Sequence, residues 1–355
     1  MVAHIEKKPL EFYLPKILEC AIPTEERGIA RDEVRLMVSN KITDKIEHDI
    51  FKNLTSYLQE GDVLVINTSG TLNAAIPTIL PNKKPGRIHL STKLNEKEWI
   101  VEFRQIHGKK TKRFFGISPD QLFDLPFGGK AKTLESFYQN NSSNSHLSLW
   151  KVEFYFEESV EEFLEKNGIP IRYDDVHNIY PNSYYQTVFA NQYGSAEMPS
   201  AGRAFTTELV TKLVSKGIQF APILLHTGVA SLEIDEKPYP EYFEVSKGSA
   251  NIVNQAKSEN RRIIAIGTTA IRAIESATQN DGKVKPLKGF TNLFITPEKG
   301  LKTVNGLLTG FHEPKASHLL MMEALADHEH LKLSYEEAIK KEYQWHEFGD
   351  LHLIV

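Results

Sequence analysis

A helix pattern followed directly by a buried-strand pattern is the feature that most constrains the fold. The helix is predicted from Thr206 or Thr207, either of which can cap it, to Gly217, which ends it. Residues 218–225 are almost continuously apolar, as in a parallel-sheet strand covered on both faces. Ligands of α/β proteins bind at the carboxyl ends of such strands, so His226 is predicted to lie at a binding site.

Residues 185–205, before this helix, show neither a helix period nor a strand period. Glycines, small residues and a proline are concentrated there, including Gly194, Pro199 and Gly202. Glycine lets a backbone approach another group closely, so this segment is predicted to be an ordered loop against a ligand.

The remaining chain alternates strand and helix patterns outside one long segment. Strands are predicted at 31–38, 63–66, 261–266, 291–295 and 351–355, and helices at 50–58, 159–166 and 270–277. This alternation predicts an α/β fold built on a mainly parallel sheet, either open or barrel-like.

Residues 73–156 have a different texture, with short alternating segments separated by Gly, Pro and Asn clusters. They are predicted to form an inserted antiparallel β domain, with 1–72 and 157–355 making the larger α/β domain. Between Pro81 and Lys132 there are twelve Lys or Arg against five acidic residues. The run Lys109, Lys110, Lys112 and Arg113 is either a solvated hairpin or a contact to a phosphate backbone.

Composition limits the classes of protein that fit. The net charge of −4 argues against bulk nucleic-acid binding, although the local basic excess permits a polyanion at residues 73–156. The single cysteine, Cys20, excludes an internal disulfide and a cysteine-rich metal site, and no metal is expected. We find no leader pattern and no apolar run of membrane-spanning length, so a cytoplasmic protein, monomeric or weakly dimeric, is expected.

Three strand ends carry residues suited to chemistry. Gly267, Thr268 and Thr269 lie between a strand and a helix, where backbone N–H groups and hydroxyls could face an anion, although Thr269 could also be a plain helix cap. His226 and His312 lie at predicted strand ends and could accept a proton near neutral pH. A hydrogen-bonded structural role for His226 stays open.

Several of these motifs together resemble one enzyme family. Residues 185–190 (YQTVFA) and 194–205 (GSAEMPSAGRAF) are similar to the YQTVYA and GSVAAPTAGLHF signature of the S-adenosylmethionine:tRNA ribosyltransferase-isomerases of the queuosine pathway. Matching blocks follow in the family's order: Arg31-Asp32 with Arg35-Leu36, 61–67, Gly267-Thr268-Thr269 with Arg272 and Glu275, Phe311-His312 with Pro314-Lys315, and Tyr343 with Gly349-Asp350. The resemblance covers nearly the whole chain.

The resemblance implies a reaction and its participants. The ribosyl part of the co-substrate S-adenosylmethionine would move to 7-aminomethyl-7-deazaguanine at the wobble position of a partner tRNA, giving epoxyqueuosine and releasing adenine and methionine. It implies a β-barrel inserted in an α/β domain and no metal. His312, His226 and Glu241 would be catalytic. Substrate would be bound by Gln186, Gly194, Ser195, Pro199, Ser200, Gly202, Arg203, Phe205, Gly228, Thr268, Thr269, Arg272, Glu275, Lys315 and Asp350, and tRNA by Lys109, Lys110, Lys112 and Arg113.

Departures from the family pattern keep three functions open. The family's TAGLHF is 200–205 (SAGRAF) here, which places Arg203 for leucine and Ala204 for histidine. The terminal YRFFSYGD is 343–350 (YQWHEFGD), and the HxMH segment has become 236–239 (EKPY). The chain is thus a tRNA-modifying transferase with an altered site, a paralogue with another acceptor in which Arg203, Glu313 and His346 are new site groups, or a silent RNA-binding protein.

Overall fold

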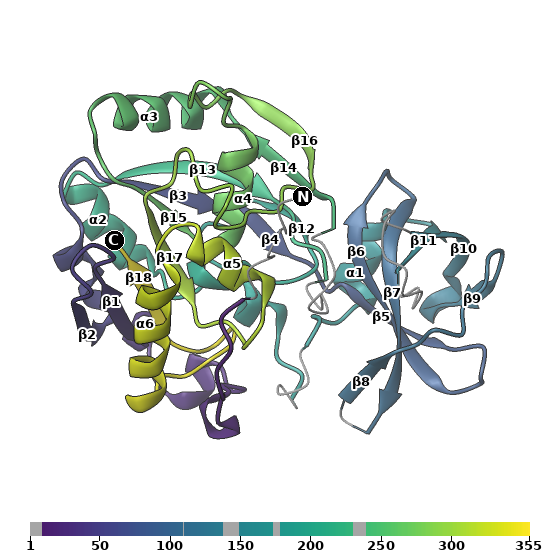
Figure 1. The fold of residues 1–355 in the computed structure, drawn as a ribbon. Coiled ribbons are helices and arrows are strands. Elements are labelled where there is room, and N and C mark those ends of the chain that lie inside the picture. Colours follow the sequence, from purple (N-terminus) through teal and green to yellow (C-terminus); the bar gives the residue numbers. More distant parts are fainter. Residues whose placement is uncertain (1–8, 109, 138–148, 173–177, 230–238) are drawn as a thin grey trace, which may run out of the picture.

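The computed structural model describes residues 9–108, 110–137, 149–172, 178–229 and 239–355. In this part of the chain the strands form sheets of nine, seven and two strands. The nine-stranded sheet with its helices lies beside the smaller, strongly curved seven-stranded sheet (Figure 1). None of the described helices has the length and apolarity that crossing a membrane requires.

The nine-stranded sheet is mixed. Its order is β16 (Leu287–Thr291), β14 (Glu241–Val245), β13 (Gln219–Leu225), β3 (Val63–Asn67), β15 (Ile263–Ile266), β17 (Gly306–Gly310), β18 (Leu351–Ile354), β1 (Arg35–Ser39) and β2 (Ile46–Ile50). Four of its eight pairings are parallel and four antiparallel, so the expectation of a mainly parallel sheet is corrected. The centre, β13-β3-β15-β17, is parallel, and three of the antiparallel pairings lie toward the borders, where short connections such as 40–45 favour hairpins.

Alternation along the central strands divides the apolar residues between two cores. Val63 and Val65 of β3 enter the core beneath α3 (Lys247–Ser258), α4 (Thr268–Ser276), α5 (Ser317–Glu323) and α6 (His328–Lys340). Leu64 and Ile66 enter the opposite core, which contains α2 (Thr207–Ser215) and the 3₁₀ helix η4 (Phe51–Tyr57). A strand covered on both faces needs this run of apolar residues, so β3 is buried throughout.

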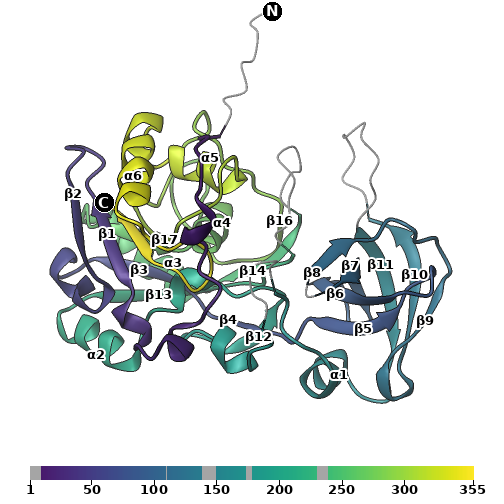
Figure 2. The same ribbon diagram turned by 90° about the horizontal axis from the view of Figure 1, so that it is seen from below.

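The seven-stranded sheet is antiparallel and nearly closed. It runs β5 (Ala75–Ile79), β6 (Pro85–Lys93), β7 (Glu98–His107), β11 (Leu149–Tyr155), β10 (Lys130–Ser136) and β9 (Leu122–Asp124), and β8 (Lys110–Arg113) pairs with β7. Thr78 Oγ1 of β5 donates to the Asp124 carbonyl of β9 at 3.2 Å, which links the two ends. Helix α1 (Val160–Asn167), capped by Ser159, packs Phe163 and Leu164 into the core of this sheet, next to β5 (Figure 2).

The predicted elements are confirmed where the signal is local. Thr206 Oγ1 accepts from the Leu209 N–H at 3.2 Å, so α2 begins where expected, and β13 follows it. Residues 185–205 are more ordered than predicted, because β12 (Gln192–Ser195) pairs in parallel with β4 (Ser69–Thr71) between the 3₁₀ turns η6 (Asn182–Tyr185) and η7 (Ser200–Gly202). The shorter 3₁₀ turns are η1 (Lys16–Leu18), η2 (Thr24–Arg27), η3 (Arg31–Glu33) and η5 (Pro126–Gly128).

Candidate active site

A chain of hydroxyl groups joins three of the predicted segments at one edge of the nine-stranded sheet. Ser69 Oγ lies 2.5 Å from Ser195 Oγ and 2.8 Å from His226 Nδ1. Ser195 Oγ also accepts from the Thr227 N–H at 3.0 Å. Burial, and then Lys93, lower the pKa of His226 to about 4, so its imidazole is neutral at pH 7.

Gly194 is required by this arrangement. A Cβ atom at Gly194 would lie 2.5 Å from Cε1 of His226, so any side chain there would displace the ring. The sequence signal for a close backbone approach thus has a physical cause here, although the neighbour is a histidine of the chain itself.

The next group is an ion pair that fixes the loop after β13. Glu241, at the start of β14, accepts from the Gly228 N–H at 2.8 Å and pairs with the guanidinium of Arg272 from α4. Arg272 also donates to the carbonyls of Leu293 and Thr291 at 3.2 and 3.3 Å. This network leaves the Glu241 carboxylate and the Arg272 guanidinium with little freedom to move.

Beside this pair lies a pocket of about 550 Å³, which we call the Arg272 pocket. Its polar side is formed by the Gly228 backbone, Glu241, Arg272 and His318, and its other walls are mainly apolar: Val229, Tyr239, Leu293, Phe294, Ile295 and Met321, with Ser317 beside them. The lining matches an organic ligand with an apolar part and a charged or polar part.

His312 lies behind one wall of the Arg272 pocket. Its ring stacks on that of His318, with centroids 4.8 Å apart and planes 12° apart. Its Nε2 lies 2.9 Å from Thr309 Oγ1, and its carbonyl accepts from Trp345 Nε1 at 3.0 Å. Burial, and then His318, hold the pKa of His312 well below its usual value, so the ring is neutral at pH 7.

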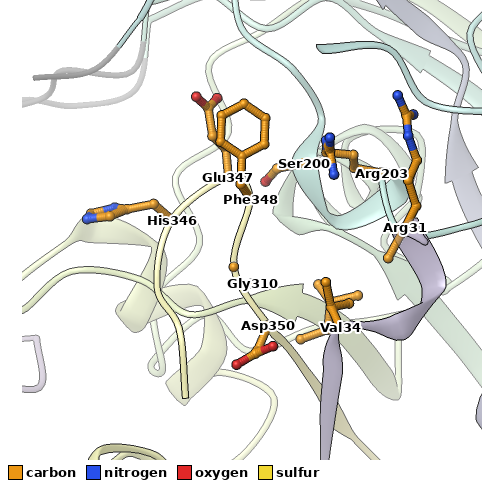
Figure 3. A pocket seen from close by; sticks show the side chains of 12 residues that line it. Arg31, Val34, Ser200, Arg203, Gly310, His346, Glu347, Phe348 and Asp350 are labelled. Carbon is orange, nitrogen blue, oxygen red and sulfur yellow. The ribbon is translucent and has the colours of Figure 1, made fainter. Parts of the chain in front are cut away.

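A second pocket, of about 290 Å³, is the Arg203 pocket. Figure 3 shows Ser200 and Arg203 on one side of it, Glu347 and Phe348 on another, and Asp350 and Val34 across from them. Gly310, at the end of β17, is also part of the lining. The loop after β12 and the end of β17 therefore meet here.

Arg203 is 3% exposed, and its guanidinium is held by the chain itself. It donates to the Tyr184 carbonyl at 2.9 Å and to Thr24 Oγ1 at 3.1 Å, pairs with Glu25 at 2.5 Å, and lies over the Phe348 ring. Burial opposes ionisation of Glu25, but Arg203 lowers the pKa of that carboxyl to about 2. Arg203 therefore positions the pocket wall.

A tight loop, residues 344–350, presents the acidic groups of the Arg203 pocket. Asp350 fastens it by accepting from the N–H groups of Gln344 at 2.7 Å and Arg35 at 2.8 Å. Burial raises the pKa of Asp350 despite these bonds. Burial, and then Glu197, raise the pKa of Glu347 to about 8, and within the described residues its Oε1 has no hydrogen-bond partner. Glu347 is thus a protonated carboxylic acid at pH 7.

Other predicted substrate-binding residues lie away from the pocket linings. Glu275 accepts from the N–H groups of 302–304 at 2.9 to 3.0 Å, Lys315 pairs with Glu11, and Phe205 packs on Phe51 and Phe189 in the core. Gln186 bonds both backbone groups of Thr71. Thr269 Oγ1 accepts from Asn67 at 3.4 Å, Thr268 begins α4, and Pro199 and Gly202 flank Ser200 in buried positions.

Three of the four predicted tRNA-binding residues, Lys110, Lys112 and Arg113, belong to β8, which pairs with β7 at one end of the seven-stranded sheet (Figure 1). Lys110 and Lys112 are exposed, whereas Arg113 lies 2.8 Å from the buried carboxylate of Glu102. Lys109 is outside the described residues, as are 236–238 of the altered HxMH segment.

A Ser–His–Asp arrangement occurs elsewhere and does not form a site. His330 lies 2.9 Å from Ser39 Oγ and 2.7 Å from Asp44, and His352 lies 2.7 Å from the same hydroxyl. Ser39 is fully buried, so a substrate could not reach it; the group joins β1, β18 and α6. Among the side chains that the structure describes, no group of three or more His, Cys, Asp or Glu could hold a metal ion.

Sequence reasoning missed Glu347, Glu197 and His318. Glu347 and Glu197 stand where the family has small residues, which is a signal that the sequence offers. The sequence does not show that Glu197 lies close enough to raise the pKa of Glu347. His318 carries no sequence signal that sets it apart from a solvated helix residue, yet it lines the Arg272 pocket. Burial, and then Arg272, lower the pKa of His318 to about 4.

Comparison with known proteins adds an independent observation. A family profile described as "Queuosine biosynthesis protein" matches residues 7–354. The chain is 33% identical to the S-adenosylmethionine:tRNA ribosyltransferase-isomerase of Carboxydothermus hydrogenoformans, over 98% of this chain and 99% of that protein. It is 33% identical to the protein of the same name from a Thermoanaerobacter species, over 98% and 100%. A crystal structure of the S-adenosylmethionine tRNA ribosyltransferase of Thermotoga maritima is similar, with a TM-score of 0.53 and 26% identity over 98% and 99% of the chains.

Proposed function

This chain belongs to the queuosine biosynthesis protein family. We propose that the Arg272 pocket and the Arg203 pocket together form the active site for the reaction after which its relatives are named. The chain is an enzyme of the S-adenosylmethionine:tRNA ribosyltransferase-isomerase class. The observation that carries the proposal is that matched segments far apart in sequence, around Ser195, Gly228 and Arg272, meet at one edge of the sheet.

In the proposed reaction the ribosyl part of S-adenosylmethionine moves to the aminomethyl group of a 7-deazaguanine base in tRNA and rearranges to epoxyqueuosine. Adenine and methionine leave. The sulfonium makes the adjacent C5′ proton acidic, so the site must provide a base beside that carbon and space for the leaving adenine.

We assign S-adenosylmethionine to the Arg272 pocket. The apolar wall made by Leu293, Phe294 and Ile295 suits an adenine ring or a thioether chain, and Tyr239 offers an aromatic face to a sulfonium cation. The Glu241–Arg272 pair is already closed, so it serves mainly to hold the loop of Gly228 in shape.

His312 is the proposed base, with His226 and Glu241 as alternatives. A neutral imidazole can accept a proton, and burial keeps His312 neutral at pH 7. The ring of His318 lies between the His312 ring and the Arg272 pocket. A proton taken from a ligand in that pocket would therefore reach His312 by way of His318.

The acceptor base is assigned to the Arg203 pocket. A deazaguanine with an aminomethyl group presents several N–H donors, and Asp350 and Glu347 present carboxyl oxygens as acceptors.

Calorimetric titration with S-adenosylmethionine tests the first assignment. Arg272→Met should weaken binding at least about tenfold, because Glu241 loses its cation and the Gly228 loop that it holds loses its geometry. Arg262→Met is the matched control, since Arg262 pairs with Asp62 at 2.9 Å just before β15, at the opposite end of that strand. Equal loss in both variants would indicate destabilisation and remove the pocket assignment.

Release of adenine in the presence of precursor tRNA tests the reaction itself. Release only with another acceptor would favour a paralogue, which the gathering of Arg203 and Glu347 around one pocket supports. S-adenosylmethionine binding without any release, or no binding at all, would leave a catalytically silent RNA-binding protein.

A further inference from the structure

The outer face of β6 carries an unusual cluster of positive charge. Alternation along this strand sends Ile88 and Leu90 into the core of the seven-stranded sheet and turns Arg87, His89 and Ser91 to the other face. On the neighbouring strand β7, Arg104 lies directly opposite Arg87 and Glu102 opposite His89. Two like charges in direct cross-strand register destabilise a sheet unless another group compensates them.

Arg104 is compensated within the chain, and Arg87 is not. Arg104 lies 2.6 Å from Glu102 and donates to Thr111 Oγ1 at 2.9 Å, and Glu102 also holds Arg113. Among the described residues, no hydrogen bond or ion pair engages the half-buried guanidinium of Arg87. Burial, and then Arg172, lower the pKa of Arg87, so the charge is both desolvated and close to another cation.

His89 is the second observation, independent of the arginines. It is 4% exposed, and its Nε2 has no hydrogen-bond partner within the described residues. Burial, and then Arg104, Arg87 and Arg172, keep the pKa of His89 well below its usual value. A buried ring nitrogen without a partner, surrounded by three guanidinium groups, is an arrangement that an anion would complete.

The same face leads to the candidate active site. Ser91 Oγ accepts from the Val229 N–H at 3.1 Å, next to the Gly228 N–H that Glu241 holds. Four residues of strand separate Arg87 from Ser91, a distance of about 13 Å. Arg172 also acts on the pKa of Tyr185, in the segment beside the Arg203 pocket.

We propose that Arg87, His89 and Arg172 form a phosphate-binding site that holds one phosphodiester of the tRNA backbone close to the nucleotide in the active site. This inference rests on the proposed function, because it takes tRNA as the acceptor. Guanidinium groups recognise phosphate through paired N–H donors, and a single phosphate fixed on the strand that leads to the active site would set the register of the bound tRNA. Strand β7 lies between this cluster and strand β8 of the lysine hairpin.

The test measures tRNA binding by the full chain, with fluorescence anisotropy as the readout, over a range of salt concentrations. Arg87→Gln should weaken binding about tenfold and reduce the slope of log K against log salt by about one, the loss of a single phosphate contact. Lys84→Gln is the matched control, because it removes one exposed charge three residues away on the same hairpin and should change little. Thermal melting of both variants checks that the sheet is intact.

Inorganic phosphate, titrated while the His89 ring is followed by NMR, separates the two sources of phosphate. A response that is lost in Arg87→Gln, together with weakened tRNA binding, supports the proposal. A phosphate response with unchanged tRNA binding would make this a free-anion site and overturn it. If the wild-type protein binds tRNA and Arg87→Gln binds equally, only this inference fails, whereas no tRNA binding by the wild-type protein would overturn it and the proposed function together.

Discussion

Two mostly buried arginines, Arg203 and Arg272, each pair with one glutamate, but the pockets beside them differ. At the Arg272 pocket, both oxygens of Glu241 are bonded, and the wall that remains is largely apolar. At the Arg203 pocket, the pair Arg203–Glu25 is equally closed, yet Glu347 keeps a proton and has an unpartnered oxygen among the described residues.

This difference in hydrogen-bond pairing indicates what kind of ligand each pocket can select. A pocket whose polar groups are already paired selects by shape and apolar contact, whereas an unpartnered carboxylic acid selects for a ligand with hydrogen-bonding groups. Arg203 and Glu347 also stand where the family signature has leucine and serine. We therefore expect changes at the Arg272 pocket to affect S-adenosylmethionine chemistry and changes at the Arg203 pocket to affect stability and the acceptor.

The largest effect is expected for His312→Ala. Removing the proposed base should lower kcat by about 10²- to 10⁴-fold, while affinity for S-adenosylmethionine stays within roughly tenfold, because a proton acceptor acts mainly in the transition state. Single-turnover adenine release and calorimetry measure the two quantities. His318→Ala, which alters the pocket wall, should change affinity more than His312→Ala does. Retained turnover in His312→Ala would move the base to His226 or Glu241.

Arg203→Leu, which restores the family residue, should cost about 2 kcal/mol of unfolding free energy, because the partly buried Glu25 loses one of its two cations and keeps only Arg31. Urea denaturation measures this loss. Adding Glu25→Gln should recover only part of it, because the carboxylate that lost Arg203 is then neutral but Arg31 loses its own partner. The affinity for S-adenosylmethionine should not change in either variant. A tenfold loss of that affinity would mean that the two pockets are one site.

Glu347 gives a pH test with a definite sign. Its pKa is about 8 in the folded protein and near 4.3 when unfolded, so between these values only the unfolded chain loses the proton. Stability should therefore fall as pH rises from about 4.3 to 8, and Glu347→Gln should remove this part of the fall, leaving the variant about 1–2 kcal/mol more stable than the wild type at pH 8. Thermal melts between pH 4 and 9 measure it. Parallel curves for both proteins would show that Glu347 is ionised in the fold.

The sequence predicts the caps, helices and strands that depend on residues close together in the chain. The cap at Thr206, the strand that ends before His226 and the helix expected at 159–166 depend on local sequence, and all are confirmed. The pairings that decide the pockets are not local: Arg203 reaches Glu25 over 178 positions, and Glu275, predicted to face substrate, binds the backbone of 302–304 instead. Ser334 and Glu337 have the spacing of a capping box, but α6 begins after Asp327 and Ser334 is buried within it.

The division of the chain at residues 73 and 156 stays a prediction. The alternation of apolar and polar residues explains why 73–156 is predicted to be a separate β unit. It gives no information on which residues cover the ends of the resulting barrel. Phe163 and Leu164 of α1 and Ile171 belong to the same hydrophobic core as β6 and β7. A unit cut at 156 would expose these residues' partners, so we expect any independently stable fragment to extend at least to 171.

The smallest effect is expected for the lysine hairpin, which lies away from both pockets. Lys110 and Lys112 are exposed, whereas Arg113 is held by the buried carboxylate of Glu102, so the two lysines are better placed than Arg113 to contact a nucleic-acid backbone. Lys110→Ala with Lys112→Ala should weaken tRNA binding a few-fold and lower the salt slope by about one to two, with affinity for S-adenosylmethionine unchanged. Arg113→Ala serves as the contrast: it leaves Glu102 with one cation fewer, so it should lower the melting temperature more than the double lysine variant does. An unchanged salt slope in the lysine variant would remove the hairpin from the binding surface and leave the cluster around Arg87 as the contact of this sheet with tRNA.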